Sequence, residues 1–132
     1  VAELPASDET LEIIQKGLYD AVNKKHGTGY WHVRAEDVSI SGKTGTAQVV
    51  GRREEPEKTG EEGEEKRPRK YLPHAWFIGY APSDRPEIAV SVLVEHGEHG
   101  SSGAGPLAKE MMLTYLNRDA EKDAGNAGDQ GE

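Results

Sequence analysis

The sequence predicts an α+β fold in which a three-stranded antiparallel sheet is flanked by helices. Three segments with strand-forming patterns, 38–50, 71–81 and 88–95, follow one another along the chain. A long loop and a short turn join them, and neither connection offers the crossover helix that parallel pairing requires. Segments with apolar residues at helical spacing precede and follow the three strands. We therefore expect an antiparallel meander with the two helices on opposite faces of the sheet.

Length and composition limit what the chain can be. Its 132 residues are 34% apolar and 30% charged, enough for one modest hydrophobic core. The absence of cysteine excludes disulfide frameworks, thiolate zinc sites and cysteine nucleophiles. A net charge of −8 argues against general nucleic-acid binding, and no apolar run approaches the roughly 20 residues of a membrane span. Because the chain starts at Val1 rather than at methionine, we expect a piece of a longer protein.

The first helix is expected to begin after Ser7. This residue can act as the N-cap, and Asp8 and Glu9 place negative charge in the first turn, where the helix dipole favours it. Lys24 and Gly27 then supply a C-terminal signal. One face carries apolar residues at helical spacing: Leu11, Ile14, Leu18, Ala21 and Val22. This pattern favours a helix that covers one side of the sheet.

The strands carry apolar residues on both faces. Segment 38–50 places Val38 and Ile40 on one face and Ala47 and Val49 on the other. Segment 88–95 repeats this arrangement, with valines on one face and alanine and leucine on the other. Such patterns are typical of strands that are covered on both sides.

A second helix should follow Pro106, which suits the first helical position. Its apolar stripe is broad enough to pack on the sheet: Leu107, Ala108, Met111, Met112, Tyr115 and Leu116. Two polar segments are expected to remain outside the packed structure. Residues 52–70 contain seven acids and seven bases, which predicts a mobile charged loop, and residues 117–132 read as a disordered acidic tail. Residues 1–116 then form the single domain.

The candidate site lies in residues 41–48, whose sequence is Ser-Gly-Lys-Thr-Gly-Thr-Ala-Gln. Here Lys43, Thr44 and Thr46 offer an ammonium group and two hydroxyls, and Gly45 lets another backbone approach closely. Such an edge suits an anionic, peptide-like ligand. Considered alone, the triplet also fits an ordinary edge strand, in which a lysine discourages aggregation and threonine is a common strand residue.

Histidines offer a weaker alternative. A metal site could be formed by Glu95, His96, Glu98 and His99. The neighbouring glycines argue against it, because they would hold the ligands only loosely. The remaining ones, His26, His32 and His74, are expected to be ordinary loop and strand residues. We therefore expect no metal and no cofactor.

Three motifs together make the chain resemble the class B penicillin-binding proteins of the elongation type, commonly called penicillin-binding protein 2. They are residues 41–48, residues 74–82 (His-Ala-Trp-Phe-Ile-Gly-Tyr-Ala-Pro), and Glu-His-Gly at 95–97 followed by Ser-Ser-Gly-Ala-Gly-Pro at 101–106. The chain lacks the Ser-x-x-Lys and Ser-x-Asn motifs of that family. It is therefore similar to only the C-terminal part of the transpeptidase domain, a partial penicillin-binding and serine β-lactamase-like fold.

The resemblance implies a D,D-transpeptidase that cross-links peptidoglycan stem peptides through a serine acyl-enzyme and is acylated by β-lactams at the same serine. That nucleophile lies outside this chain, which alone should be inactive. By resemblance, Lys43 would orient the proton relay and attract the substrate carboxylate, and the hydroxyls of Thr44 and Thr46 would bind that carboxylate. The backbone N–H of Thr46 would be an oxyanion donor, and Gly45 would keep the edge open.

The same resemblance implies partners and a location. The N-terminal part of the domain, peptidoglycan stem peptides, β-lactams and proteins of cell elongation are the expected partners, with no nucleic acid. The parent protein would be membrane-anchored and act on the outer face of the cytoplasmic membrane. Two alternatives to an enzyme stay open: a non-catalytic penicillin-binding-like sensor, and a structural lobe that docks on elongation proteins.

Overall fold

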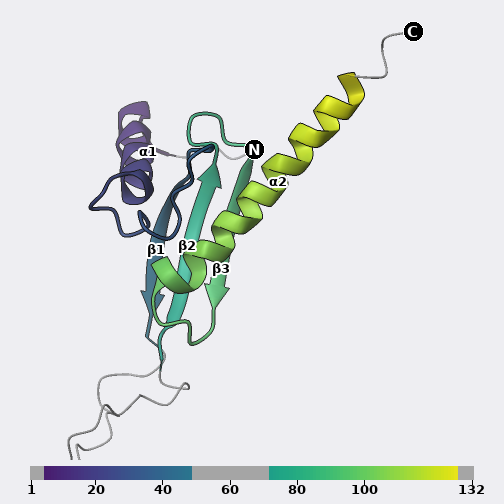
Figure 1. Cartoon of the computed structure of the whole chain (residues 1–132). Coiled ribbons are helices and arrows are strands. Elements are labelled where there is room, and N and C mark those ends of the chain that lie inside the picture. Colours follow the sequence, from purple (N-terminus) through teal and green to yellow (C-terminus); the bar gives the residue numbers. More distant parts are fainter. Residues whose placement is uncertain (1–4, 49–71, 128–132) are drawn as a thin grey trace, which may run out of the picture.

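The computed structural model describes residues 5–48 and 72–127. It contains a three-stranded sheet, a helix beside the first strand, and a long second helix that crosses the sheet and extends past it (Figure 1). The predicted charged loop, 52–70, lies outside the described residues. Within the described ranges no helix combines the length and the hydropathy needed to cross a membrane.

Helix α1 (Asp8–Asn23) begins where its capping signal predicts. The Ser7 hydroxyl accepts a hydrogen bond from the Thr10 backbone N–H at 3.3 Å, which satisfies one of the free donors of the first turn. The helix ends at Asn23, and the N–H of the following Lys24 still donates to the Asp20 carbonyl. The predicted N-cap is therefore confirmed, whereas the helix ends at Asn23 with Lys24 in an extended conformation and without a left-handed glycine.

Strands β1 (Ser41–Ala47), β2 (His74–Ala81) and β3 (Ile88–Val94) pair antiparallel in the order β1-β2-β3, so the predicted meander is confirmed. The first strand is shorter than residues 38–50 predict and starts only at Ser41. The preceding segment binds the turn after β2 instead, because the Ser83 N–H donates to the Ser39 carbonyl at 2.9 Å. Those backbone groups are thus used outside the ladder.

The core lies on one face of the sheet. Phe77 of β2 and Met112 of α2 (Gly105–Ala127) are fully buried there, together with Val22 of α1. On the other face Ile78 is 52% exposed and Leu93 is 45% exposed. The prediction of helices on opposite faces is therefore wrong, because α1 lies beside β1 and contributes to the same core as α2 (Figure 1).

Helix α1 shows the same one-sided burial. Of its predicted apolar face only Val22 is buried, while Leu11, Leu18 and Ala21 are half-buried. Ile14 is 51% exposed, so its predicted packing is wrong for the described part of the chain. In the described part of the chain, β1 is the strand against which α1 mainly packs.

A π-helical turn, η3 (Gly100–Ala104), leads directly into α2. The predicted tail is wrong for residues 117–127, because α2 continues to Ala127. Six of its eleven residues are good helix formers, namely three alanines, Arg118, Glu121 and Lys122. Such residues extend a helix that packing upstream has already nucleated, and low hydrophobicity alone does not stop it.

Candidate functional site

The Lys-Thr-Gly triplet lies in the middle of β1, a terminal strand of the described sheet. Its register places Lys43 opposite Ile78 and Gly45 opposite Trp76. Cross-strand partners share a face, so these residues lie on the face that the helices leave exposed. The ammonium group of Lys43 therefore projects from the same face as a partly exposed apolar surface formed by Trp76, Ile78 and Leu93.

Lys43 is exposed, and its Nζ donates a hydrogen bond to the Thr44 carbonyl at 2.5 Å. Within the described ranges it forms no ion pair with a carboxylate. A lysine that pairs with no carboxylate of the described residues can bind an anionic ligand.

The two threonines lie on the other face of β1. Thr44 pairs with Phe77 and Thr46 pairs with Ala75, both on the core side of β2. Thr46 nevertheless remains exposed, because it lies close to the end of the strand. The site residues thus come from both faces of one strand, and a ligand that contacts all of them must lie along its edge.

Thr28 is a contact of the site that sequence reasoning missed. Its Oγ1 lies 2.9 Å from Oγ1 of Thr44, and either hydroxyl can be the donor. Thr28 belongs to the turn after α1, where the Gly29 N–H donates to the Ala21 carbonyl at 2.9 Å. The glycines of this segment signalled a turn, but no sequence signal indicated which residue of the turn contacts the strand. Since a hydroxyl can both donate and accept, Thr44 retains hydrogen-bonding capacity for a ligand.

Gly45 is open on one side and covered on the other. A Cβ at Gly45 would meet only the Trp76 Cβ, at 3.2 Å, so the exposed face leaves room for a ligand. On the core side the backbone of Gly45 is covered by Gly100 of η3, where a Cβ would lie 2.4 Å from the Gly45 carbonyl oxygen. Gly100 thus packs against the core side of β1 at the glycine of the triplet.

The histidines fall into two groups. His26 and His32 are exposed in the segment after α1. His74 and His96 lie together, with ring centroids 5.0 Å apart. In the described part of the chain, no three residues of the types His, Cys, Asp and Glu are grouped so that they could hold a metal ion.

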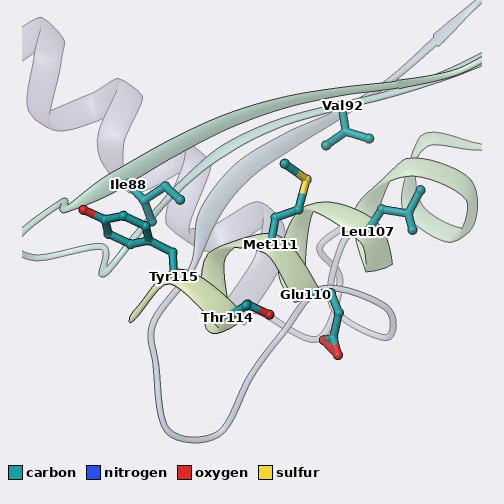
Figure 2. Close-up of a pocket in the computed structure, with 7 residues that line it drawn as sticks. All are labelled: Ile88, Val92, Leu107, Glu110, Met111, Thr114 and Tyr115. Atoms are coloured by element: carbon teal, nitrogen blue, oxygen red, sulfur yellow. The ribbon is translucent and has the colours of Figure 1, made fainter. Parts of the chain in front are cut away.

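A separate apolar groove of about 670 Å³ lies between β3 and α2 (Figure 2). Its wall on α2 consists of partly exposed side chains, with Leu107 52%, Met111 53% and Tyr115 43% exposed. Ile88 and Val92 of β3 form the opposite wall. Because β3 is the strand farthest from β1 in the sheet, this groove is not part of the Lys-Thr-Gly site.

Comparison with protein families gives a match over most of the chain. The family model "Penicillin binding protein transpeptidase domain" matches residues 1–113. The chain is 40% identical over 107 residues to the peptidoglycan D,D-transpeptidase MrdA of Haemophilus influenzae, and 35% identical over 114 residues to MrdA of Acinetobacter baumannii. These alignments cover 81% and 83% of the chain but 16% and 15% of the relatives. The chain therefore corresponds to a small part of each relative.

Solved structures agree with this match. The chain superposes on a penicillin-binding protein, PBP2, from Helicobacter pylori in complex with MreC with a TM-score of 0.63 at 31% identity. It superposes on Pseudomonas aeruginosa PBP2 in complex with WCK 5153 with a TM-score of 0.62 at 28% identity. Each superposition covers 86% of this chain, and 18% and 20% of the respective neighbour.

Proposed function

The chain belongs to the penicillin-binding protein transpeptidase family, and on this premise we propose that it is the C-terminal part of a peptidoglycan D,D-transpeptidase. It supplies the Lys-Thr-Gly strand to an acyl-transfer site whose serine nucleophile lies outside the chain. The observation that carries the proposal is the placement of Lys43 and Gly45 on the uncovered face of a terminal strand, supported from the core side by Gly100. A rigid strand with one open edge is what an extended peptide substrate requires.

The proposed reaction transfers an acyl group between two amines. The serine Oγ attacks the carbonyl between two D-alanines of a stem peptide, and the terminal D-alanine leaves as an amine after taking up a proton. An amine of a neighbouring stem then attacks the acyl-enzyme, forms the cross-link and releases the serine. β-Lactams acylate the same serine, which is then no longer available to the stem peptide.

Each site residue has a role in this reaction. Lys43 attracts the substrate carboxylate and orients the proton relay, while the hydroxyls of Thr44 and Thr46 donate hydrogen bonds to that carboxylate. The backbone N–H of Thr46 donates to the oxyanion, a contact that is worth roughly 3 kcal/mol in acyl-transfer sites. The missing side chain of Gly45 leaves room for the substrate backbone, since only Trp76 lies near the position of a Cβ.

The remainder of the transpeptidase domain is the proposed first partner. The described residues leave two apolar surfaces uncovered: the groove between β3 and α2, and the face of the sheet that carries Ile78 and Leu93. The outer edge of β3 has no strand partner in the described residues. Covering these surfaces with one further body removes both the apolar exposure and the free strand edge.

A second partner is a protein of the cell-elongation machinery, since one structural neighbour is a complex of PBP2 with MreC. We propose that the intact protein is anchored in the cytoplasmic membrane and works on its outer face, where peptidoglycan is cross-linked.

Labelling with a fluorescent penicillin tests the function. The intact protein that contains this segment should form a covalent adduct, and the segment alone should form none. An adduct on the segment alone would place the nucleophile inside the chain and contradict the proposal. Reversible penicillin binding to the intact protein without an adduct would instead indicate a sensor.

A further inference from the structure

The loop between β3 and η3, residues 95–99, is fixed to the start of β2 by three hydrogen bonds. The His96 backbone N–H donates to Nδ1 of His74 at 3.0 Å, and the Glu98 N–H donates to the Pro73 carbonyl at 3.0 Å. Nδ1 of His96 lies 3.0 Å from the Leu72 carbonyl oxygen. The contacts join segments that are more than twenty residues apart in the sequence, so the loop has one defined position.

The chemistry of these contacts fixes the state of both rings. A nitrogen that accepts an N–H cannot carry a proton, so Nδ1 of His74 is unprotonated. A carbonyl oxygen can only accept, so Nδ1 of His96 must carry a proton and donate to Leu72. Each ring therefore makes one directed hydrogen bond: Nδ1 of His74 accepts, and Nδ1 of His96 donates.

The loop needs such support because its backbone is unusual. His96 has a φ of 55° and Glu98 a φ of 63°, both in the left-handed region that residues other than glycine rarely adopt. Conformations of this kind persist when surrounding contacts over-determine them, and they are concentrated near functional sites. Here those contacts come from residues 72–74.

The loop leads directly to the part of η3 that supports the triplet. Gly100 follows it, and a Cβ at Gly100 would lie 2.4 Å from the carbonyl oxygens of both Gly45 and Trp76. His74 itself is the cross-strand partner of Ala47, the residue after Thr46. His74 thus lies in β2 beside the end of the proposed oxyanion strand, and His96 lies in the loop that leads to Gly100 of η3.

We propose that His74 and His96 are positioning residues for the Lys-Thr-Gly strand. Their hydrogen bonds hold the loop, the loop holds Gly100 against the backbone of Gly45, and this contact fixes the direction of the neighbouring Thr46 N–H. The inference rests on the proposed transpeptidase function and adds to it two residues that do not touch the substrate. A displacement of less than 1 Å at such a donor is enough to slow acylation.

The test uses two nearly isosteric substitutions in the intact protein. His74→Asn keeps an acceptor atom on Cγ, as in histidine, whereas His74→Leu replaces that atom by a methyl group. His32→Leu, at an exposed histidine in the segment after α1, is the matched control. The acylation rate constant with a fluorescent penicillin and the amide hydrogen exchange of residues 96–103 are measured for each variant.

We expect His74→Leu to acylate about fivefold to tenfold more slowly and to lose exchange protection at residues 96–103, with unchanged penicillin affinity before acylation. His74→Asn and His32→Leu should stay within about twofold of the unsubstituted protein. Where His74→Leu does not fold, His74→Ala removes the same acceptor without adding an apolar branch and should give the same slowing.

The inference would be overturned if His74→Leu and His74→Asn acylated at the same rate, whether both rates were unchanged or both were reduced. Absence of any adduct in the unsubstituted protein would overturn the proposed function and with it the catalytic role of the pair. The exchange measurement would then still decide whether the His74 acceptor holds the loop.

Discussion

Gly100 offers the sharpest stability test of the contact between η3 and β1. In Gly100→Ala the new Cβ would lie 2.4 Å from the carbonyl oxygens of Gly45 and Trp76 and 2.8 Å from the Gly45 nitrogen. All three are backbone atoms of paired strands, so none can rotate away. Either η3 or the strand pair must move, and strain of this kind costs about 1–3 kcal/mol. A loss of about 2 kcal/mol lowers Tm by about 4–8 °C in a domain of roughly 150–250 residues, and by less in a larger one.

Gly17→Ala is the matched control, because a Cβ at Gly17 in α1 would meet no atom within 4 Å. It should stabilise the helix by about 0.5–1 kcal/mol. Both variants are compared by thermal and denaturant unfolding of the intact domain, and by penicillin acylation. Gly100→Ala should lose both stability and acylation, since Gly45 has to move. A Gly100→Ala protein as stable as the unsubstituted one would refute the described contact.

Three further outcomes are expected of the intact protein. Lys43→Ala should slow penicillin acylation about 100-fold while Tm hardly changes, because an exposed ammonium group stabilises the fold little; proportionate losses of both would indicate a structural role. Thr28→Val should slow acylation severalfold by freeing the Thr44 hydroxyl, whereas Thr28→Ser should not; equal rates in the two variants would remove Thr28 from the site. Met111→Asp should lower the free energy of unfolding by more than about 2 kcal/mol if the rest of the domain covers the groove, with Glu110→Ala as the control. A neutral Met111→Asp would show that the groove faces solvent.

Local signals in the sequence predicted the elements well. Ser7 and the acidic first turn located the start of α1, and the alternating apolar residues located β2 and β3. Capping and alternation are properties of neighbouring residues, so a single sequence contains them. The end of α2 was missed because a polar composition was interpreted as disorder, although about half of the residues are good helix formers and the packed part of the helix precedes them.

Tertiary relations were harder to predict. Apolar residues on both faces of the strands predicted that both faces are covered, but in the described residues one face remains largely exposed, at Ile78 and Leu93. The triplet itself was found from its residue types. Residue types did not reveal the contacts of Thr28 and Gly100 or the pairing of His74 with His96, because each contact joins residues that are distant along the chain. Nothing in a local pattern specifies such a partner.

The core on one face of the sheet makes this chain a suitable fragment for complementation. The core on one face of the sheet buries Phe77 and Met112, so burial of apolar side chains favours folding of this fragment. In the described residues, the other face of the sheet and the groove at Met111 are apolar and exposed. Burial of these surfaces would favour binding of a separately expressed remainder of the domain. If the proposed function holds, the site forms only when the remainder of the domain lies along β1, so covalent capture of a β-lactam would report that the two fragments have reassembled. The same division would make the protein a reporter of protein association.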